Sequence, residues 1–316
     1  MAACRNLTVE QFLGMLNAGL PMVILNVLYW LAKNRPIARQ NSCVELFSGA
    51  AVITKAFKEK GHVASEYDNQ RSAIQEDILT CEGMLTCLQH ARGIVQGGLA
   101  HWATVCSSWV WMCRGATHRT ASRPEGDPKV RCVREGNGMV ARMAAVLIVL
   151  ICKSVHWVLE QPESSLMKKS LWMRHVLSLK PTYATKTYMG VFGGSTLKPT
   201  ELLSMSRWPS QLCRRKSDFD ASAAPSMVHN SIDTDGKVSV TGKTDLLKAS
   251  QVYPEAYGRE VYSLWKQNEE EIDYMPQADV TWATWRAAHN QVDWSAAAFS
   301  ELAAFLGVPD HFPLPM

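Results

Sequence analysis

SCVELFSGAA, residues Ser42–Ala51, is the stretch that decides the fold of this chain. Val44, Leu46 and Phe47 predict a short buried strand, and residues 52–60 continue it with a helical pattern. Four small residues lie between the strand and the helix, where they let the backbone approach another molecule closely. We therefore expect a ligand at this turn.

The composition is that of a folded globular protein. The chain has 316 residues, of which 47% are hydrophobic and 20% are charged, enough for one large domain with additions. The formal net charge of +4 is compatible with a polyanionic partner but does not by itself indicate one. Composition therefore favours a folded chain over a disordered one and leaves the partner open.

The nine cysteines are scattered through apolar patterns, and no secretory leader is evident before them. We expect reduced thiols in an intracellular protein, with nucleus and cytoplasm both open. The cysteines show no repeated C-x-x-C spacing with nearby histidines, so no metal is implied.

An apolar segment near the start, Phe12–Ala32, approaches the roughly 20 residues that span a bilayer. Asn17 and the break at Gly19–Pro21 favour two short helices instead. Thr8 is a candidate cap of the first helix, and Pro21 suits the first turn of the second. We predict a helical arm packed on the core, with no membrane contact.

The organising strand begins a strand–turn–helix–strand unit. Gly61 ends the helix, and residues 62–67 predict a second strand that finishes with the acidic Glu66. This order predicts an α/β fold with a doubly wound, mostly parallel sheet, in which ligands bind at the carboxyl ends of the strands. Glu66 is placed to accept from ligand hydroxyls, although a solvated acidic turn also explains it.

Two further predicted strands end in reactive residue types. Gly98–Cys106 ends in a cysteine, and His156–Glu160 ends in a carboxylate. The carboxyl ends of parallel strands share one edge, so Cys106 and Glu160 are candidates for one site. A buried cysteine that serves only packing is the alternative for Cys106.

Between these strands, residues 115–135 predict a basic loop without regular period. Such a loop could close over a phosphate backbone, or it could be solvated chain of mixed charge. Its basic residues are His118, Arg119, Arg123, Lys129, Arg131 and Arg134.

Five motifs occur in an order that resembles the cytosine-5 DNA methyltransferase family. They are FSGAA, ASEYD, DILT, ATVCSSW and LEQPES, with a weaker echo at KASQVYPEAYG and a K-P-T segment at 198–200. The resemblance covers roughly residues 42–199, about half of the chain. It implies a Rossmann-like methyltransferase fold that binds S-adenosylmethionine.

The resemblance also implies a set of cofactor contacts. The first turn would hold the methionine part, Glu66 the ribose hydroxyls, and Tyr67 would lie beside the adenine. Asp77 and Ile78 match the pair at the adenine edge. The implied cofactor residues are Phe47, Ser48, Gly49, Ala50, Glu66, Tyr67, Asp77 and Ile78.

The same resemblance assigns the chemistry. Cys106 would add to C6 of cytosine, which makes C5 nucleophilic enough to take a methyl group, and Glu160 would bind N3 of the ring. A target base must first leave the stack, which calls for a basic cleft. The implied partner is nucleic acid, with DNA favoured over RNA, and its contacts would be Trp109, Arg114, Arg119 and Arg123.

The chain also differs from the family pattern. The differing positions are Ala51, Thr104, Val105, Val110 and Gln161, where the family has glycine, two prolines, serine and asparagine. These differences motivate a second hypothesis, a degenerate member that binds nucleic acid or a protein without turnover. A third hypothesis is a methyltransferase for another acceptor that does not use Cys106. The oligomeric state and the target sequence are not indicated.

We divide the chain into four parts on these grounds. Residues 1–41 form the helical arm, 42–162 the catalytic core, 163–243 a small target-recognition-like insertion, and 244–316 a C-terminal helical segment that completes the core. Arg207–Ser239 is predicted to be irregular, and Trp282–Trp294 to be a packing surface for the last helix.

Overall fold

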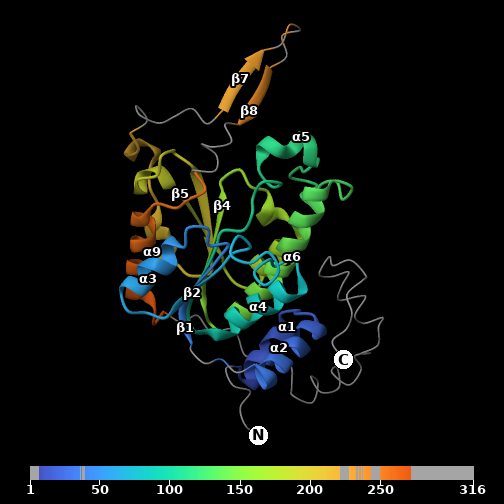
Figure 1. Ribbon diagram of the computed structural model, residues 1–316, viewed down its shortest axis with the longest axis vertical. Helices are drawn as coiled ribbons and strands as arrows, with labels where there is room; N and C mark the ends of the chain where they lie inside the picture. The colour runs from blue at the N-terminus through green and yellow to red at the C-terminus, as the bar shows by residue number, and fades with distance from the viewer. Residues whose placement is uncertain are drawn as a thin grey trace.

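A computed structural model describes residues 7–35, 37, 40–220, 228–232, 234, 236, 238–242 and 250–271. Most of the expected C-terminal segment, including Trp282–Trp294, lies outside these ranges. The architecture is α/β, with helices on both faces of a central sheet (Figure 1).

The sheet has six strands in the order β2-β1-β3-β4-β6-β5. The first four are parallel, and β6 is antiparallel to both of its neighbours. The expected mostly parallel α/β sheet is therefore confirmed. The strands are β1 (Asn41–Leu46), β2 (Ala64–Tyr67), β3 (Ile94–Trp102), β4 (His156–Pro162), β5 (Tyr183–Tyr188) and β6 (Pro199–Ser204).

Alternating side chains divide the core between the two faces of the sheet, as the pleat requires. Val44 and Leu46 pack in one apolar cluster with α4, α6 and α7, while Cys43 packs in the other with α3 and α9. Figure 1 shows α3 and α9 on one side of the sheet and α4 and α6 on the other. These helices are α3 (Val52–Glu59), α4 (Cys81–Gly93), α6 (Arg131–Cys152), α7 (Leu171–Ser178) and α9 (Glu255–Asn268).

The N-terminal arm consists of two short helices, α1 (Val9–Asn17) and α2 (Met22–Asn34), which confirms the prediction. Thr8 caps α1 in a reciprocal pair with Gln11, at distances of 3.2 and 2.9 Å. Leu7, Phe12 and Leu28 are buried in the same cluster as α6, so the arm covers part of the core.

Helix α6 begins at Arg131, earlier than the predicted start of the buried run at Met139, and absorbs the end of the expected basic loop. Of the helices in the described ranges, this one alone is long and apolar enough to cross a membrane, and 78% of its apolar window is buried inside the fold. Packing against the sheet accounts for that composition.

Two further elements differ from the predictions. β3 ends at Trp102, so Cys106 lies in the loop after the strand instead of at its last position. The expectation of irregular chain over 207–239 is wrong in part, because a hairpin of β7 (Val228–Ile232) and β8 (Val238–Gly242) projects from the molecule (Figure 1).

The stretch 163–243, expected to be an insertion, contributes β5 and β6 to the main sheet. The chain reaches β5 at the sheet edge through α7 and returns as β6 beside β4. In this stretch, β7 and β8 are the described strands that do not join the main sheet.

The order of the strands places a switch point between β1 and β3. The chain leaves β1 toward β2 on one side and later enters β3 on the other side. In open α/β sheets, ligands bind in the crevice that opens at the carboxyl ends of such a pair. The turn after Leu46 and the loop after Trp102 both border this crevice.

The turn after β1 contains a residue in an unfavourable conformation. Ala51, the cap of α3, has a φ of 55°, in the left-handed region that costs a residue with a Cβ roughly 1–2 kcal/mol. Ala50 is not among the residues with positive φ.

Ala51→Gly should therefore raise the free energy of unfolding by about 0.5–1 kcal/mol, since strain relief exceeds the entropy that glycine adds to the unfolded chain. The matched variant Ala50→Gly should lower it by about 0.5–1 kcal/mol, because it adds entropy without relieving strain. Urea unfolding of both variants checks this. Equal destabilisation by the two substitutions would contradict the strain at Ala51.

Candidate active site

The turn over 47–51 is fixed by the end of β2. The backbone N–H groups of Phe47 and Ser48 donate to the Tyr67 carbonyl at 2.7 and 3.2 Å, and Gly49 N donates to Asp68 Oδ2 at 2.9 Å. A Cβ built on Gly49 would meet no atom within 4 Å. The turn is therefore rigid, and the space above Gly49 is open to a ligand.

Glu66 is already paired in this structure. Its two carboxylate oxygens lie 2.9 Å from Lys58 Nζ and 2.9 Å from Arg71 Nη1. Burial opposes ionisation of Glu66, but the hydrogen bonds and charges of the two cations outweigh it and lower its pKa. To accept from a ligand hydroxyl, Glu66 would have to share or exchange one of these partners.

Tyr67 and Ile78 are both buried and form the wall behind the turn. The Tyr67 hydroxyl donates to the Gly83 carbonyl at 3.0 Å, and the Phe47 ring meets Tyr67 edge to face with centroids 6.4 Å apart. Arg142, fully buried in α6, donates to the Ile78 carbonyl. These contacts hold the segment after β2 close to the crevice.

A cavity of about 220 Å³ opens beside this wall. Asp77 and Glu135 supply carboxylates to its lining, and Leu79, Val105 and Met139 supply apolar surface. Sites for small organic ligands combine such an apolar lining with a few polar groups and usually measure roughly 300–1,000 Å³. The cavity therefore suits part of a ligand such as a nucleoside.

The cysteine loop is anchored to β1 and β4. Ala103 N donates to the Leu46 carbonyl at 3.0 Å, and Gln161 Nε2 donates to the Thr104 carbonyl at 2.7 Å. Ser165 Oγ donates in turn to Gln161 Oε1 at 3.0 Å. Gln161 stands where the pattern of the cytosine-5 methyltransferase family has asparagine. Its side chain, longer than that of asparagine, holds the cysteine loop in place.

Cys106 is half-buried, and its thiol is protonated at neutral pH. Burial, and to a smaller extent the charge of Glu160, raise the pKa of Cys106, the charge of Lys198 lowers it, and the net pKa is about 11. With that pKa, about one thiol in 10⁴ is ionised at pH 7. The influence of Glu160 and Lys198 shows that all three side chains share one electrostatic environment.

Glu160 is buried at the end of β4. Its Oε2 accepts a hydrogen bond from the Tyr253 hydroxyl at 2.8 Å, and its Oε1 lies 3.4 Å from Lys198 Nζ. Oε1 has no hydrogen-bond partner although it is shielded from solvent. A buried carboxylate oxygen without a donor is an acceptor available to a ligand.

Sequence reasoning gave Lys198 and Tyr253 no role in the site. Both residues lie in stretches that resemble motifs of the cytosine-5 methyltransferase family, the K-P-T segment and KASQVYPEAYG. The sequence therefore did contain a signal that these stretches belong to the site. What the pattern does not show is that the chain segments before β6 and α9 bring these two side chains to the end of β4.

A buried polar row, also missed, continues from the site along the α9 face of the sheet. Glu45 and His101 are register partners on β1 and β3, and His101 Nε2 lies 3.0 Å from the Tyr257 hydroxyl. Glu45 Oε2 accepts from Thr54 N at 2.8 Å. Burial raises the pKa of Glu45 to about 7 and lowers the pKa of His101 to about 3, so near neutral pH the histidine is uncharged and Glu45 is protonated in about half of the molecules.

Of the four expected nucleic-acid contacts, Trp109 and Arg119 are buried. The Arg119 guanidinium lies 3.4 Å from the Trp109 ring centroid and donates to the Pro124 carbonyl at 2.6 Å and to Ser108 Oγ at 3.2 Å. The pair therefore fixes the cysteine loop to the start of α6 and is not at the surface. Arg114 is half-buried, and Arg123 is exposed.

Trp111 is the exposed aromatic residue of this region. It follows the cysteine loop, in the 3-10 turn Trp111–Cys113, and is 62% exposed. The short helix α5 (Arg114–Thr117) comes next, at the end of the molecule opposite to α1 and α2 (Figure 1). Trp111 was not among the predicted contact residues.

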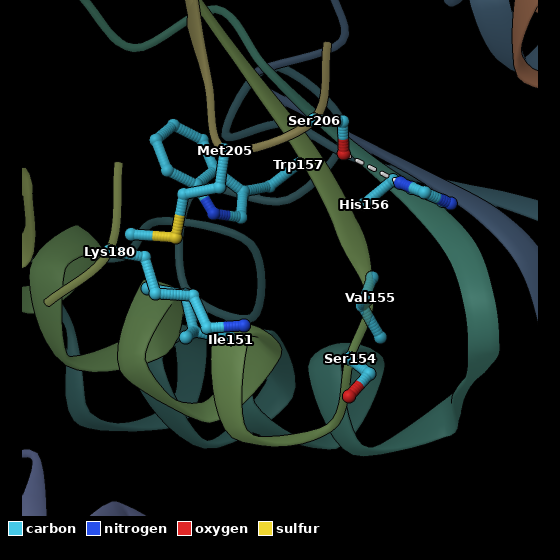
Figure 2. Close-up of a pocket in the computed structure, with 8 residues that line it drawn as sticks. All are labelled: Ile151, Ser154, Val155, His156, Trp157, Lys180, Met205 and Ser206. Atoms are coloured by element: carbon cyan, nitrogen blue, oxygen red, sulfur yellow. Dashed lines mark hydrogen bonds between the residues drawn. The ribbon is translucent and has the colours of Figure 1, made fainter. Parts of the chain in front are cut away.

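A second, smaller cavity lies at the opposite, amino end of β4. Figure 2 shows it between Lys180, Trp157 and Met205, beside the hydrogen bond of 2.6 Å that joins His156 Nδ1 to Ser206 Oγ. Its volume of about 30 Å³ corresponds to little more than a water molecule. The carboxyl edge is therefore the better candidate for a functional site.

No family model, curated protein or solved structure matches this chain. Within the described part of the chain, no group of three or more His, Cys, Asp or Glu side chains could hold a metal ion.

Glu45 generates a pH-dependent prediction. Its pKa is about 7 in the folded state against 4.5 for a free side chain, so the stability that it contributes is full below pH 4.5 and is lost as the pH rises to about 7. Glu45→Gln removes this dependence and keeps an acceptor for Thr54 N. Between pH 5 and 8, the variant should gain about 2.5 kcal/mol in free energy of unfolding relative to wild type.

Chemical denaturation at several pH values measures this difference. Glu59→Gln, at an exposed position of α3, is the control and should leave the pH dependence unchanged. A Glu45→Gln curve parallel to that of wild type would show that Glu45 is ionised in the folded protein at all these pH values.

Proposed function

We propose that this protein is an S-adenosylmethionine-dependent methyltransferase that acts on C5 of cytosine in nucleic acid, with Cys106 as nucleophile and Glu160 as its partner. The observation that supports this most is the placement of the two residues at one edge of the sheet. Cys106 lies in the loop after β3, Glu160 lies near the carboxyl end of the adjacent parallel strand β4, and the charge of Glu160 raises the pKa of the thiol.

The residues present fit a nucleoside-containing methyl donor in part. Gly49 leaves open space above the turn, and Asp77 and Leu79 line the adjacent cavity, which suits a nucleoside. Phe47 and Ser48 would contact the methionine part, while Glu66 would reach the ribose by sharing its ion pairs. When bound, the donor supplies an electrophilic methyl group.

The side chains of the protein would then perform the following chemistry. The Cys106 sulfur, after losing its proton, forms a bond to C6, and the electron pair of the C5–C6 double bond moves toward C5. That pair would form the new carbon–carbon bond to the methyl group as the bond between this group and the sulfonium of the donor breaks, which leaves the donor sulfur neutral. Loss of the C5 proton to water would then restore the double bond and release Cys106 as a thiolate.

Glu160 would stabilise the charge that the ring gains during addition. Its free Oε1 can accept from the amino group or a protonated N3 of cytosine, and Tyr253 holds the other oxygen in place. Such preorganised groups commonly contribute about 10²–10³ in rate.

The loop after Cys106 would contact the nucleic acid. Trp111 offers an exposed ring for base stacking, and Arg123 is an exposed cation for phosphate. We retain DNA as the first substrate to test, with RNA as the other.

A second candidate function is binding without turnover. Three observations favour it: the thiol pKa of about 11, the two ion pairs that already engage Glu66, and the strained Ala51 at the first turn. A protein of this kind would bind nucleic acid or a protein partner through the same edge.

A mechanism-based trap separates the two candidates. An oligonucleotide with 5-fluorocytosine, given with S-adenosylmethionine, should form an adduct with the wild type that survives denaturing electrophoresis, because fluorine cannot leave as the C5 proton does. Cys106→Ser should give none. Glu160→Gln should slow adduct formation by about 10²–10³.

Cys113→Ser is the matched control, since Cys113 is a neighbouring, partly buried thiol outside the proposed chemistry. It should form the adduct at the wild-type rate. Absence of any adduct from wild type that binds S-adenosylmethionine would favour binding without turnover. Adduct formation by Cys106→Ser would exclude Cys106 as the nucleophile.

Trp111→Ala should weaken binding of a single-stranded oligonucleotide about 5- to 150-fold, the range that the loss of roughly 1–3 kcal/mol of base stacking produces. Trp30→Ala is the control, because Trp30 is 48% exposed but lies on α2, far along the chain and at the other end of the molecule (Figure 1). Fluorescence anisotropy measures both affinities. Equal affinities of the two variants would exclude Trp111 as a contact.

A further inference from the structure

Lys198 occupies an unusual place beside the proposed site. It immediately precedes β6, and its side chain is only 19% exposed. Its Nζ lies 3.4 Å from Glu160 Oε1 and 4.9 Å from the centroid of the Tyr253 ring. A lysine is rarely enclosed to this degree unless its charge is paired.

The backbone at Lys198 is also strained. Its φ of 38° lies in the left-handed region, which disfavours residues with a Cβ. The carbonyl of Lys198 accepts from Met189 N at 3.3 Å and from Thr200 Oγ1 at 3.0 Å, which holds this conformation. Strain that the surroundings maintain is common where a side chain must point at a functional site.

Lys198 lies among several other titratable groups. Glu160 on β4 faces it, Cys106 follows β3, His101 lies on β3, and Tyr253 precedes α9. The positive charge of Lys198 lowers the pKa of both Cys106 and His101, secondary to the effect of burial. It therefore favours a thiolate and keeps the histidine neutral.

The balance of charges explains what this arrangement achieves. A thiolate at Cys106 beside an ionised Glu160 would place two negative charges in one partly buried site, which is unfavourable in a low dielectric. Lys198 offsets that repulsion. It also holds Glu160 Oε1 by charge alone, at a distance that leaves this oxygen able to accept a hydrogen bond from a ligand.

We infer that Lys198 is a positioning residue that orients Glu160 and supplies positive charge that favours the thiolate form of Cys106. Its part in turnover rests on the proposed methyltransferase function. Its effect on the thiol does not, because thiol reactivity requires neither a methyl donor nor nucleic acid.

Alkylation of Cys106 by iodoacetamide tests the inference. The thiolate displaces iodide, a sulfur–carbon bond forms, and the thiol proton goes to the buffer, so the rate follows the thiolate fraction. Mass spectrometry of the peptide that contains Cys106 separates it from the other cysteines. At pH 9, Lys198→Met should slow alkylation by about three- to tenfold, since loss of a positive charge that lowers the pKa of Cys106 should raise that pKa by up to roughly one unit.

Two variants test whether charge is the cause. Lys198→Arg keeps the positive charge and should remain within about threefold of wild type, since one pKa unit is a factor of ten in thiolate. Glu160→Gln removes the opposing negative charge and should accelerate alkylation. This second variant keeps the inference testable even if Lys198→Met fails to fold.

Lys168→Met is the matched control, because Lys168 pairs at 2.6 Å with a different carboxylate, that of Glu201 on β6. This variant should leave the alkylation rate unchanged. Equal rates for wild type and a folded Lys198→Met would overturn the inference, as would a slower rate for Glu160→Gln. Slow alkylation of Lys198→Met together with no adduct in the 5-fluorocytosine experiment would support the role of Lys198 toward the thiol and refute turnover.

Discussion

Parallel pairing of β1 with β2 on one side and with β3 on the other is the constraint on which the site depends. Because the two partners run in the same direction as β1, all three carboxyl ends meet at one edge of the sheet. At that edge, the Tyr67 carbonyl accepts hydrogen bonds from the Phe47 turn, which follows β1, and the Leu46 carbonyl accepts one from the cysteine loop, which follows β3. These bonds order the two loops together. Loss of this pairing would separate every group of the proposed site.

Burial decides the chemistry available at this edge. It raises the pKa of Cys106 and of Glu45, and it leaves Glu160 Oε1 without a donor. Each of these groups is costly for the folded state. The neutral His101, the partly protonated Glu45 and the ion pair of Glu160 with Lys198 limit this cost, because together they keep little net charge inside the protein.

Sequence patterns that span only a few residues predicted the starts of the first helices and the first strand. Thr8 and Pro21 mark the starts of α1 and α2, and the apolar run at Val44 leads into α3, as expected. The hairpin β7–β8 also has a turn signal in the sequence, because Asp235 and Gly236, a pair typical of two-residue hairpin turns, lie between the two strand segments.

The site depended more on contacts between distant parts of the chain. The order of motifs predicted that Cys106 and Glu160 would lie at one edge of the sheet, and the structure places Cys106 after β3 and Glu160 near the end of the parallel strand β4. It could not predict that Tyr253, which is 93 residues away, would donate to Glu160. Nor could it predict that Arg119 would fold back onto Trp109 and leave Trp111 exposed, because side-chain packing decides which aromatic is buried.

Transfer of a labelled methyl group tests the central claim most directly. The protein is incubated with S-adenosylmethionine that carries a tritiated methyl group and with cytosine-containing DNA, single-stranded and duplex, or RNA. The nucleic acid is then digested to nucleosides and separated. We expect the label to elute as a 5-methylcytosine nucleoside. Label that is absent from all nucleosides, from a protein shown to bind S-adenosylmethionine, would contradict a cytosine methyltransferase.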